Sequence, residues 1–352
     1  LIGDVDPIKA ASLKLPYSDE RVIHFGLIPR SHRGIFVINE LPDLQARIQV
    51  ALFNILQEKD VQIRGFKIRL PLDVQFVFTA NPEDYTNRGS IVTPLKDRID
   101  SQILTHYARS IDESKKITEL ETKLTKDQIE KVEVPDMIKD LVERISFEAR
   151  KSEYVDSKSG VSARLTISAM ENLISTAERR MLINNDEKTT VRISDFVGVI
   201  PSITGKVELV YEGEQEGTAT VAQILIGKSI KKHFEEFFPS PDKLKKSQEK
   251  NPYSEIIHWF SHNNLDILNN TSNNQYWKIL CNVKSLSEVV NKYHPNLPEN
   301  EKYLMMEFLL HGLAEFSLIS KQHVEFGLQF KDMISTMFAK HSEEAVSYTH
   351  LR

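Results

Sequence analysis

Two short stretches of the sequence place side chains where they could bind and cleave a phosphate. The apolar run 35–38 ends at Asn39-Glu40, and the apolar run 74–79 is followed by Asn81. The carboxyl ends of parallel strands form the ligand-binding edge of an open α/β sheet, so both sets of side chains would lie at that edge. There, residue 39 can order Mg²⁺, Glu40 can polarise an attacking water, and Asn81 can hold that water from the opposite side.

Two arginines could complete such a site. Arg98 follows the loop after the second strand, from which it can reach the γ-phosphate of a neighbouring subunit and offset the charge that develops in the transition state. Arg164 opens a predicted helix in the run Gly160–Leu165 and can swing onto the phosphates when a helical lid closes.

Each of these residues also has a structural interpretation. Glu40 could be a solvent-facing acid at a strand end, Asn81 a loop-starting residue before proline, Arg98 a surface side chain paired with a nearby aspartate, and Arg164 an ordinary helix former. Taken singly, the patterns are weak. Their order along the chain, and the strands and helix on which they fall, favour the functional interpretation.

The surrounding pattern indicates the elements that hold this site. Apolar residues recur at helical spacing over 44–56, and the stretch 61–70 alternates like a β-hairpin. The two apolar runs fit strands that are buried on both faces, as in a parallel sheet. Strand, helix and strand in this order predict a parallel α/β sheet over residues 1–108. We expect an all-helical segment at 109–203, a linker at 204–219 and a helical C-terminal domain at 220–345. The end, 346–352, has the character of an artefactual tail.

Composition and charge limit the partners and the cellular location that we expect for the protein. The net charge of -5 does not predict a nucleic-acid partner, although Arg64, Lys67 and Arg69 put positive charge on the predicted hairpin. These side chains could face a central pore and bind a substrate there, or they could form a solvated face of the hairpin. The single cysteine, Cys281, favours a reducing, cytoplasmic location, and no apolar stretch is long enough to predict a membrane span.

The runs Ile38–Leu44, Thr79–Asp84 and Leu95–Arg98 resemble the AAA+ motor subunit of magnesium chelatase and its MoxR-like relatives, the helix-2-insert group. The resemblance covers about residues 1–200. It implies a partial P-loop AAA+ parallel-sheet core followed by a helical lid. It also implies ATP and Mg²⁺ as cofactors, a homo-oligomeric, hexameric ring, and a partner protein with a von Willebrand A-type domain.

By the same resemblance, Glu40 is the catalytic Walker B glutamate, Asn81 is sensor 1, Arg98 is the arginine finger and Arg164 is sensor 2. Asn39 departs from the family, which has aspartate there. Asparagine keeps the shape but loses the charge, so we expect weaker, indirect Mg²⁺ binding through Asn39 and Glu40.

A second departure is the missing phosphate-binding loop. No G-x-x-x-x-G-K-[ST] pattern precedes Asn39. We therefore expect an N-terminally truncated piece that is inactive alone, from an intact protein that hydrolyses ATP.

The sequence leaves three functions open. The favoured one is an AAA+ motor of the magnesium chelatase subunit I or MoxR-like type, which couples ATP hydrolysis to remodelling of a partner protein. The alternative is a non-hydrolysing AAA+ scaffold, supported by Asn39. An AAA+ transcription activator ranks lowest, because its Gly-Ala-Phe-Thr-Gly-Ala loop does not occur in residues 1–34.

Overall fold

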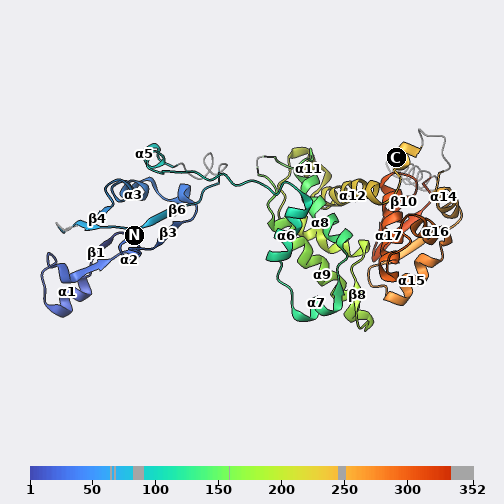
Figure 1. The fold of residues 1–352 in the computed structure, drawn as a ribbon, viewed down its shortest axis with the longest axis horizontal. Coiled ribbons are helices and arrows are strands. Elements are labelled where there is room, and N and C mark those ends of the chain that lie inside the picture. The colour runs from blue at the N-terminus through green and yellow to red at the C-terminus, as the bar shows by residue number, and fades with distance from the viewer. Residues whose placement is uncertain (64–65, 67–68, 82–90, 158, 245–250, 334–352) are drawn as a thin grey trace, which may run out of the picture. The chain divides into compact units, whose positions relative to one another are not determined.

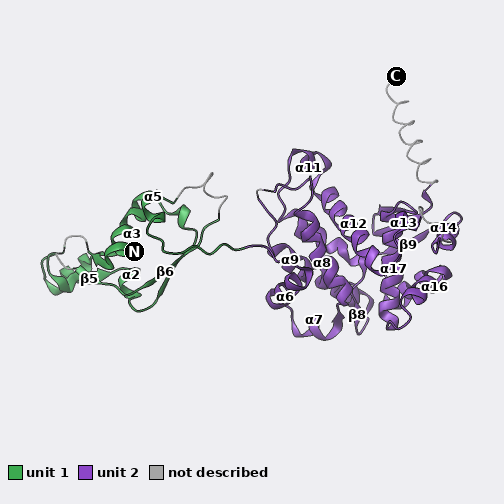
Figure 2. Cartoon of the chain, turned by 45° about the horizontal axis from the view of Figure 1, so that its top comes forward, with its two compact units in different colours: residues 1–105 green, residues 106–352 purple. Residues whose placement is uncertain are grey.

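The structure is a computed structural model that describes residues 1–352 except 64–65, 67–68, 82–90, 158, 245–250 and 334–352. The chain divides into two compact units, Leu1–Thr105 and His106–Arg352 (Figure 2). Each unit is described by itself. The first boundary expected from the sequence, at 108, lies a few residues from this division.

The first unit is built on a parallel pair of strands (Figure 1). Strand β3 (Ile35–Ile38) pairs with β6 (Gln75–Phe78) in a parallel register that sets Ile38 opposite Phe78. Between them in the chain lies helix α3 (Ala46–Glu58), which buries Leu52 and Ile55 in the same cluster as Ile38. The predicted strand-helix-strand unit and its parallel sheet are confirmed.

The expectation that both strands are buried on both faces is wrong. Phe36 and Ile38 turn toward the core of the unit, whereas Ile35 is 70% exposed and Val37 57% exposed. Side chains alternate between the two faces of a strand, and the buried cluster of this unit covers only one of them. Val77 on β6 is likewise exposed on the uncovered face.

Short elements surround this sheet. The predicted hairpin is confirmed, with β4 (Asp60–Gln62) antiparallel to β5 (Arg69–Pro71), although Arg64 and Lys67 lie outside the described residues. The remaining elements of the unit are β1 (Gly3–Val5), α1 (Pro7–Leu13), η1 (Glu20–Val22), β2 (Ile23–Phe25), α2 (Leu27–Arg30), η2 (Leu41–Asp43) and α5 (Thr93–Lys96).

The second unit is mostly helical. Its first half contains α6 (Ile111–Glu121), α7 (Lys126–Lys131), β7 (Val132–Glu133), α8 (Asp136–Ala149), α9 (Arg164–Asn184), β8 (Thr189–Thr190), η3 (Ile193–Val199), α10 (Ile200–Thr204) and α11 (Tyr211–Glu216). Its second half contains α12 (Thr218–Phe237), α13 (Pro241–Leu244), α14 (Ser254–Phe260), β9 (Leu265–Leu268), α15 (Asn273–Cys281), α16 (Lys284–Tyr293), α17 (Glu299–Glu315), β10 (Ser320–Val324) and β11 (Gly327–Lys331).

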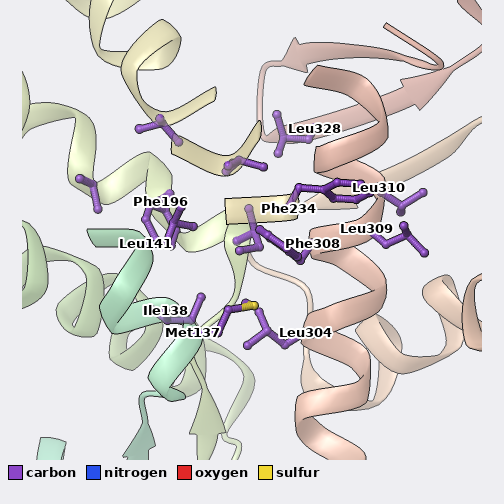
Figure 3. Packing of buried hydrophobic residues seen from close by; sticks show 14 of the residues in the cluster. Met137, Ile138, Leu141, Phe196, Phe234, Leu304, Phe308, Leu309, Leu310 and Leu328 are labelled. Carbon is purple, nitrogen blue, oxygen red and sulfur yellow. The ribbon is translucent and has the colours of Figure 1, made fainter. Parts of the chain in front are cut away.

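One hydrophobic cluster runs through the whole second unit, from Val132 to Phe330. Figure 3 shows part of it, with Leu141 of α8 on one side and Phe234 of α12 and Phe308 of α17 on the other. The ring centroids of Phe234 and Phe308 lie 6.2 Å apart. The stretch 204–219, expected as a linker, contains α11, and Leu209 pairs with Val155 in an isolated bridge. The residues on either side of that stretch therefore share one core.

The sequence predicts a helical C-terminal domain at 220–345, but the structure shows that this part of the unit also contains strands. Strands β10, β11 and β9 form an antiparallel sheet in that order. The pairing of β9 with β11 joins residues far apart in the chain, which no local pattern reveals. A Cβ at Gly327 would lie 2.3 Å from the carbonyl oxygen of Ile267, so glycine permits this close pairing.

The mixed α/β class expected from the sequence, a parallel-sheet segment followed by a mainly helical region, is confirmed. Within the described parts of the chain, no helix has both the length and the apolar character that a membrane crossing requires.

Candidate functional site

The carboxyl ends of β3 and β6 bring the predicted residues of the first unit together. Beyond the paired strands, the amide of Thr79 donates to the carbonyl of Ile38 at 3.1 Å, and the amide of Leu41 donates to the carbonyl of Thr79 at 2.9 Å. These bonds hold Asn39 and Glu40 beside Thr79, and Asn81 follows two residues later, with its side chain exposed. The strand-end juxtaposition predicted from the sequence is therefore present.

Thr79 is a positioning residue that the sequence did not single out. Its hydroxyl donates to Asn39 Oδ1 at 2.6 Å and accepts the backbone N–H of Glu40 at 2.9 Å. One hydroxyl thus fixes both residues at the end of β3. Only the parallel register of the two strands reveals this role.

The backbone of Glu40 is held in an unusual conformation. Its φ of 54° and ψ of 59° lie in the left-handed region, which costs a non-glycine residue roughly 1–2 kcal/mol. The bond from Thr79 and the η2 turn that follows, which contains Pro42, stabilise this conformation. Strained residues of this kind concentrate at functional sites, where they aim a side chain that regular backbone would direct elsewhere.

The carboxylate of Glu40 has an unsatisfied atom. Its Oε2 is shielded from solvent and has no hydrogen-bond partner among the residues that the structure describes. Leaving a buried polar atom unpaired costs about 1–3 kcal/mol, and more when the group carries charge. A water molecule or cation at this oxygen would remove that cost. The geometry therefore fits a carboxylate that orders a ligand at the sheet edge.

Among the described residues at this edge, Glu40 is the one that would offer a Mg²⁺ ion a negative charge. Asn39 contributes only a neutral oxygen that already accepts the Thr79 hydroxyl. Among the described residues, no group of three or more His, Cys, Asp or Glu side chains could hold a metal ion. Mg²⁺ commonly binds through one or two carboxylates together with waters and substrate phosphates, so the site fits an ion that arrives with a nucleotide.

Arg98 is held at the opposite end of α3 from Glu40. Its guanidinium donates to Gln57 Oε1 through Nε at 3.0 Å and Nη2 at 2.7 Å, and to the carbonyl of Pro94 at 2.6 Å. It also lies over the ring of Phe53, 5.2 Å from the centroid. Helix α3 begins near the sheet edge that carries Glu40. At ~1.5 Å per residue, Gln57 lies roughly 16 Å further along the helix axis. The structure therefore does not bring Arg98 to Glu40.

Arg98 reaches this position because α5 is fixed on α3. Leu95 of α5 is fully buried in the core of the first unit. The amide of Val92, just before α5, donates to Gln49 Oε1 at 2.9 Å, and Gln49 is itself buried on α3. The aspartate pairing considered from the sequence is replaced by the contact with Gln57, which lies 41 residues earlier in the chain.

Arg164 belongs to the second unit, where it is exposed as the first residue of α9. The turn before it is fixed by Tyr107, whose hydroxyl accepts the amide of Val161 at 3.1 Å. Arg150 lies over the Tyr107 ring at 4.0 Å and donates to the carbonyl of Val161. Gly160 has a φ of 69°, and a Cβ there would meet the Tyr107 hydroxyl at 2.3 Å. The predicted helix start at Arg164 is confirmed.

A parallel sheet edge with an acidic residue on one strand and an amide after the next is the arrangement of nucleotide-hydrolysing α/β domains. Comparison with known families agrees with this class. Residues 16–102 match the model of the Sigma-54 interaction domain, an AAA+ ATPase-type domain. The matched stretch contains Glu40, Asn81 and Arg98, whereas Arg164 lies outside it.

Among solved structures, the chain is similar to one titled "crystal structure of a putative ATPase" from Cytophaga hutchinsonii. The two sequences are 19% identical over 64% of this chain and 72% of the other. The TM-score of 0.24 is too low to indicate a shared overall arrangement. No curated protein matches the sequence.

Proposed function

We propose that this chain carries the hydrolysis half of an AAA+ ATPase motor of the MoxR-like or magnesium chelatase type, which uses ATP to remodel a partner protein. The observation that carries the proposal is the state of Glu40. Its backbone is strained, its N–H is fixed by Thr79, and its Oε2 is buried without a partner among the described residues. A glutamate held in this way suits the polarisation of a water molecule.

Each residue at the sheet edge has a different role in the proposed hydrolysis. Glu40 accepts a proton from the attacking water, and Asn81, after the neighbouring strand, orients that water through its amide. Thr79 keeps Asn39 and Glu40 in place. Mg²⁺ would be held by Glu40 and the nucleotide phosphates, with Asn39 beside it, and would supply positive charge against the phosphates.

The position of Arg98 supports assembly into a ring. Arg98 is held at the far end of α3 from Glu40, a position that suits the site of a neighbouring subunit better than that of its own. We infer a homo-oligomeric, hexameric ring in which Arg98 completes the adjacent site and Arg164 closes onto the phosphates from the helical unit. The partner that the ring remodels would carry a von Willebrand A-type domain.

ATP turnover by the complete gene product tests the proposal. Glu40→Gln keeps the size of the side chain and removes the base, so turnover should fall at least a hundredfold while nucleotide binding remains. Glu20→Gln, at an exposed position at the start of η1, is the matched control and should retain full turnover. Unchanged turnover in Glu40→Gln would contradict the assigned role. Absence of turnover in the unmodified protein would favour a non-hydrolysing scaffold. The uncharged Asn39, in place of an aspartate, is the feature that supports this alternative.

A second function has one observation in its favour. The family model that matches residues 16–102 is that of the Sigma-54 interaction domain, which makes an activator acting on that sigma factor a candidate. The Gly-Ala-Phe-Thr-Gly-Ala loop of such activators does not occur in residues 1–34. ATP-dependent binding of the complete protein to purified sigma-54, compared with a von Willebrand A-domain partner, separates the two functions.

A further inference from the structure

A small cavity of about 150 Å³ lies within the second unit, whereas Glu40 belongs to the first. It is lined by residues of η3, α10, α12, α17 and the β10–β11 hairpin and opens to the surface beside the exposed Val197 and Val324. Most of its wall is apolar, formed by side chains that include Phe196, Val197, Ile226, Ile230 and Leu328. Two of these, Phe196 and Leu328, are labelled in Figure 3. The cavity therefore lies where the first half of the unit meets the C-terminal strands.

One polar side chain in this wall is buried without a partner. His311 of α17 is 3% exposed, and neither of its ring nitrogens has a hydrogen-bond partner among the residues that the structure describes. Its Nε2 is 3.9 Å from Glu307 Oε1, which is too long for a hydrogen bond. Glu307 is already engaged, because it accepts the amides of Ile193 and Ser194 and the hydroxyl of Tyr276.

An imidazole in this state favours a ligand. Burial, followed by the charges of Lys321 and His323, holds the pKa of His311 well below its ordinary value, so the ring is neutral at neutral pH. A neutral imidazole has one N–H donor and one nitrogen acceptor. Leaving each of them unpaired is unfavourable, and a molecule with a hydroxyl or carbonyl group inside the cavity would remove that penalty.

The charges around the cavity indicate an uncharged ligand. Lys321 lines the wall, but its Nζ donates to Glu315 Oε1 at 2.6 Å, so its charge is already paired. Burial, followed by the charge of Lys321, lowers the pKa of His323 as well, which favours its neutral form. Glu325 adds a carboxylate to the lining. An anionic ligand would have to compete with Glu315 for Lys321 and approach Glu325.

We propose that this cavity is a binding site for an uncharged molecule the size of a single six-membered ring that carries one hydroxyl or carbonyl group, and that His311 is its hydrogen-bond partner. A cavity of this volume with apolar walls accommodates a benzene-sized ring. The apolar wall binds the ring, and His311 selects the polar substituent. A bound molecule would contact η3, α12 and β11 together and so stabilise the second unit.

Phenol, benzene and benzoate are probes that differ in one group. On the full chain, phenol should shift the ¹⁵N resonances of the His311 ring and raise the unfolding temperature of the second unit. Trp259 and Trp277 report that unfolding because both tryptophans lie there. With seven non-hydrogen atoms, phenol is expected to bind with a millimolar Kd. Benzene should bind more weakly than phenol, and benzoate should not bind.

Three variants complete the test. His311→Leu should abolish the preference for phenol over benzene, whereas His262→Ala, on the surface, should leave it intact. Val197→Phe fills the cavity from a position that is 43% exposed, so it should block phenol without unfolding the unit. If no probe shifts the His311 resonances, water alone occupies the cavity and the proposal fails. Tighter binding of benzoate than of phenol would overturn the assignment of an uncharged ligand.

Discussion

Replacing Thr79 with valine tests whether its hydroxyl positions the end of β3. The change preserves the shape of the side chain and removes the bonds to Asn39 Oδ1 and to the Glu40 amide. A typical hydrogen bond contributes about 0.5–1.5 kcal/mol, and water can replace part of that at this partly exposed edge, so we expect a local loss of roughly 1–2 kcal/mol. Glu40 would then be freer to leave its left-handed conformation.

Amide hydrogen exchange measures this loss at the site itself. A local free-energy loss of ~1–2 kcal/mol corresponds to roughly 5–30-fold faster exchange of the Glu40 amide. Thr79→Ser retains the hydroxyl and is the matched control, in which exchange should stay within about threefold of the parent. Amides of α9, in the other compact unit, provide an internal reference that neither variant should alter.

The result that would refute the reasoning is specific. If Thr79→Val leaves the exchange of the Glu40 amide unchanged, the 2.9 Å bond does not hold that residue in place. Faster exchange throughout the first unit would instead indicate a general loss of stability. In the complete protein, Thr79→Val should also lower ATP turnover more than it weakens nucleotide binding, because it disturbs the orientation of Glu40.

Three further predictions concern single side chains. Asn39→Asp restores a charge beside Glu40 and should lower the Mg²⁺ concentration needed for half-maximal turnover; an unchanged Mg²⁺ requirement would show that residue 39 does not contact the hydrated ion. Asp195→Ala should destabilise the second unit by about 3–5 kcal/mol in urea denaturation, because it leaves Arg180 buried without its bidentate partner. The pKa of His311 is lowered in the folded state, so the unfolded chain binds more protons below about pH 6.5 and stability should fall as the pH is lowered, by up to ~1.4 kcal/mol per unit. His311→Leu should flatten that dependence; an identical pH profile would contradict the shift.

Much of the candidate site could be predicted from the sequence because short runs of neighbouring residues indicate its strands. Apolar runs that end in Asn39-Glu40 and near Asn81 predict strands, and parallel strands necessarily end at a common edge. The register could not be read in this way. Thr79 meets Asn39 only because β3 and β6 pair with Ile38 opposite Phe78, and nothing in either run alone fixes that alignment.

The features that the sequence missed depend on long-range packing. The exposure of Val37 follows from a core that covers one face of the sheet, whereas an apolar run by itself suggests two covered faces. Strand β9 finds its partner β11 about 60 residues further along the chain, as the pairing of Ile267 with Leu328 shows. His311 resembles an ordinary core residue of an apolar helix until η3 and β10 are packed around it, where its nitrogens have no partner within the described part of the chain.

The choice between a motor and a scaffold depends on charge rather than on geometry at position 39. The Thr79 hydroxyl donates to a carbonyl oxygen there, and an aspartate could accept the same bond in the same place. Asparagine therefore leaves the left-handed turn at Glu40 and the approach of β6 undisturbed. What it removes is the second negative charge next to the carboxylate that would meet Mg²⁺. With this framework intact, the site should still orient water through Glu40, and Mg²⁺ should be held mainly by the phosphates of the nucleotide.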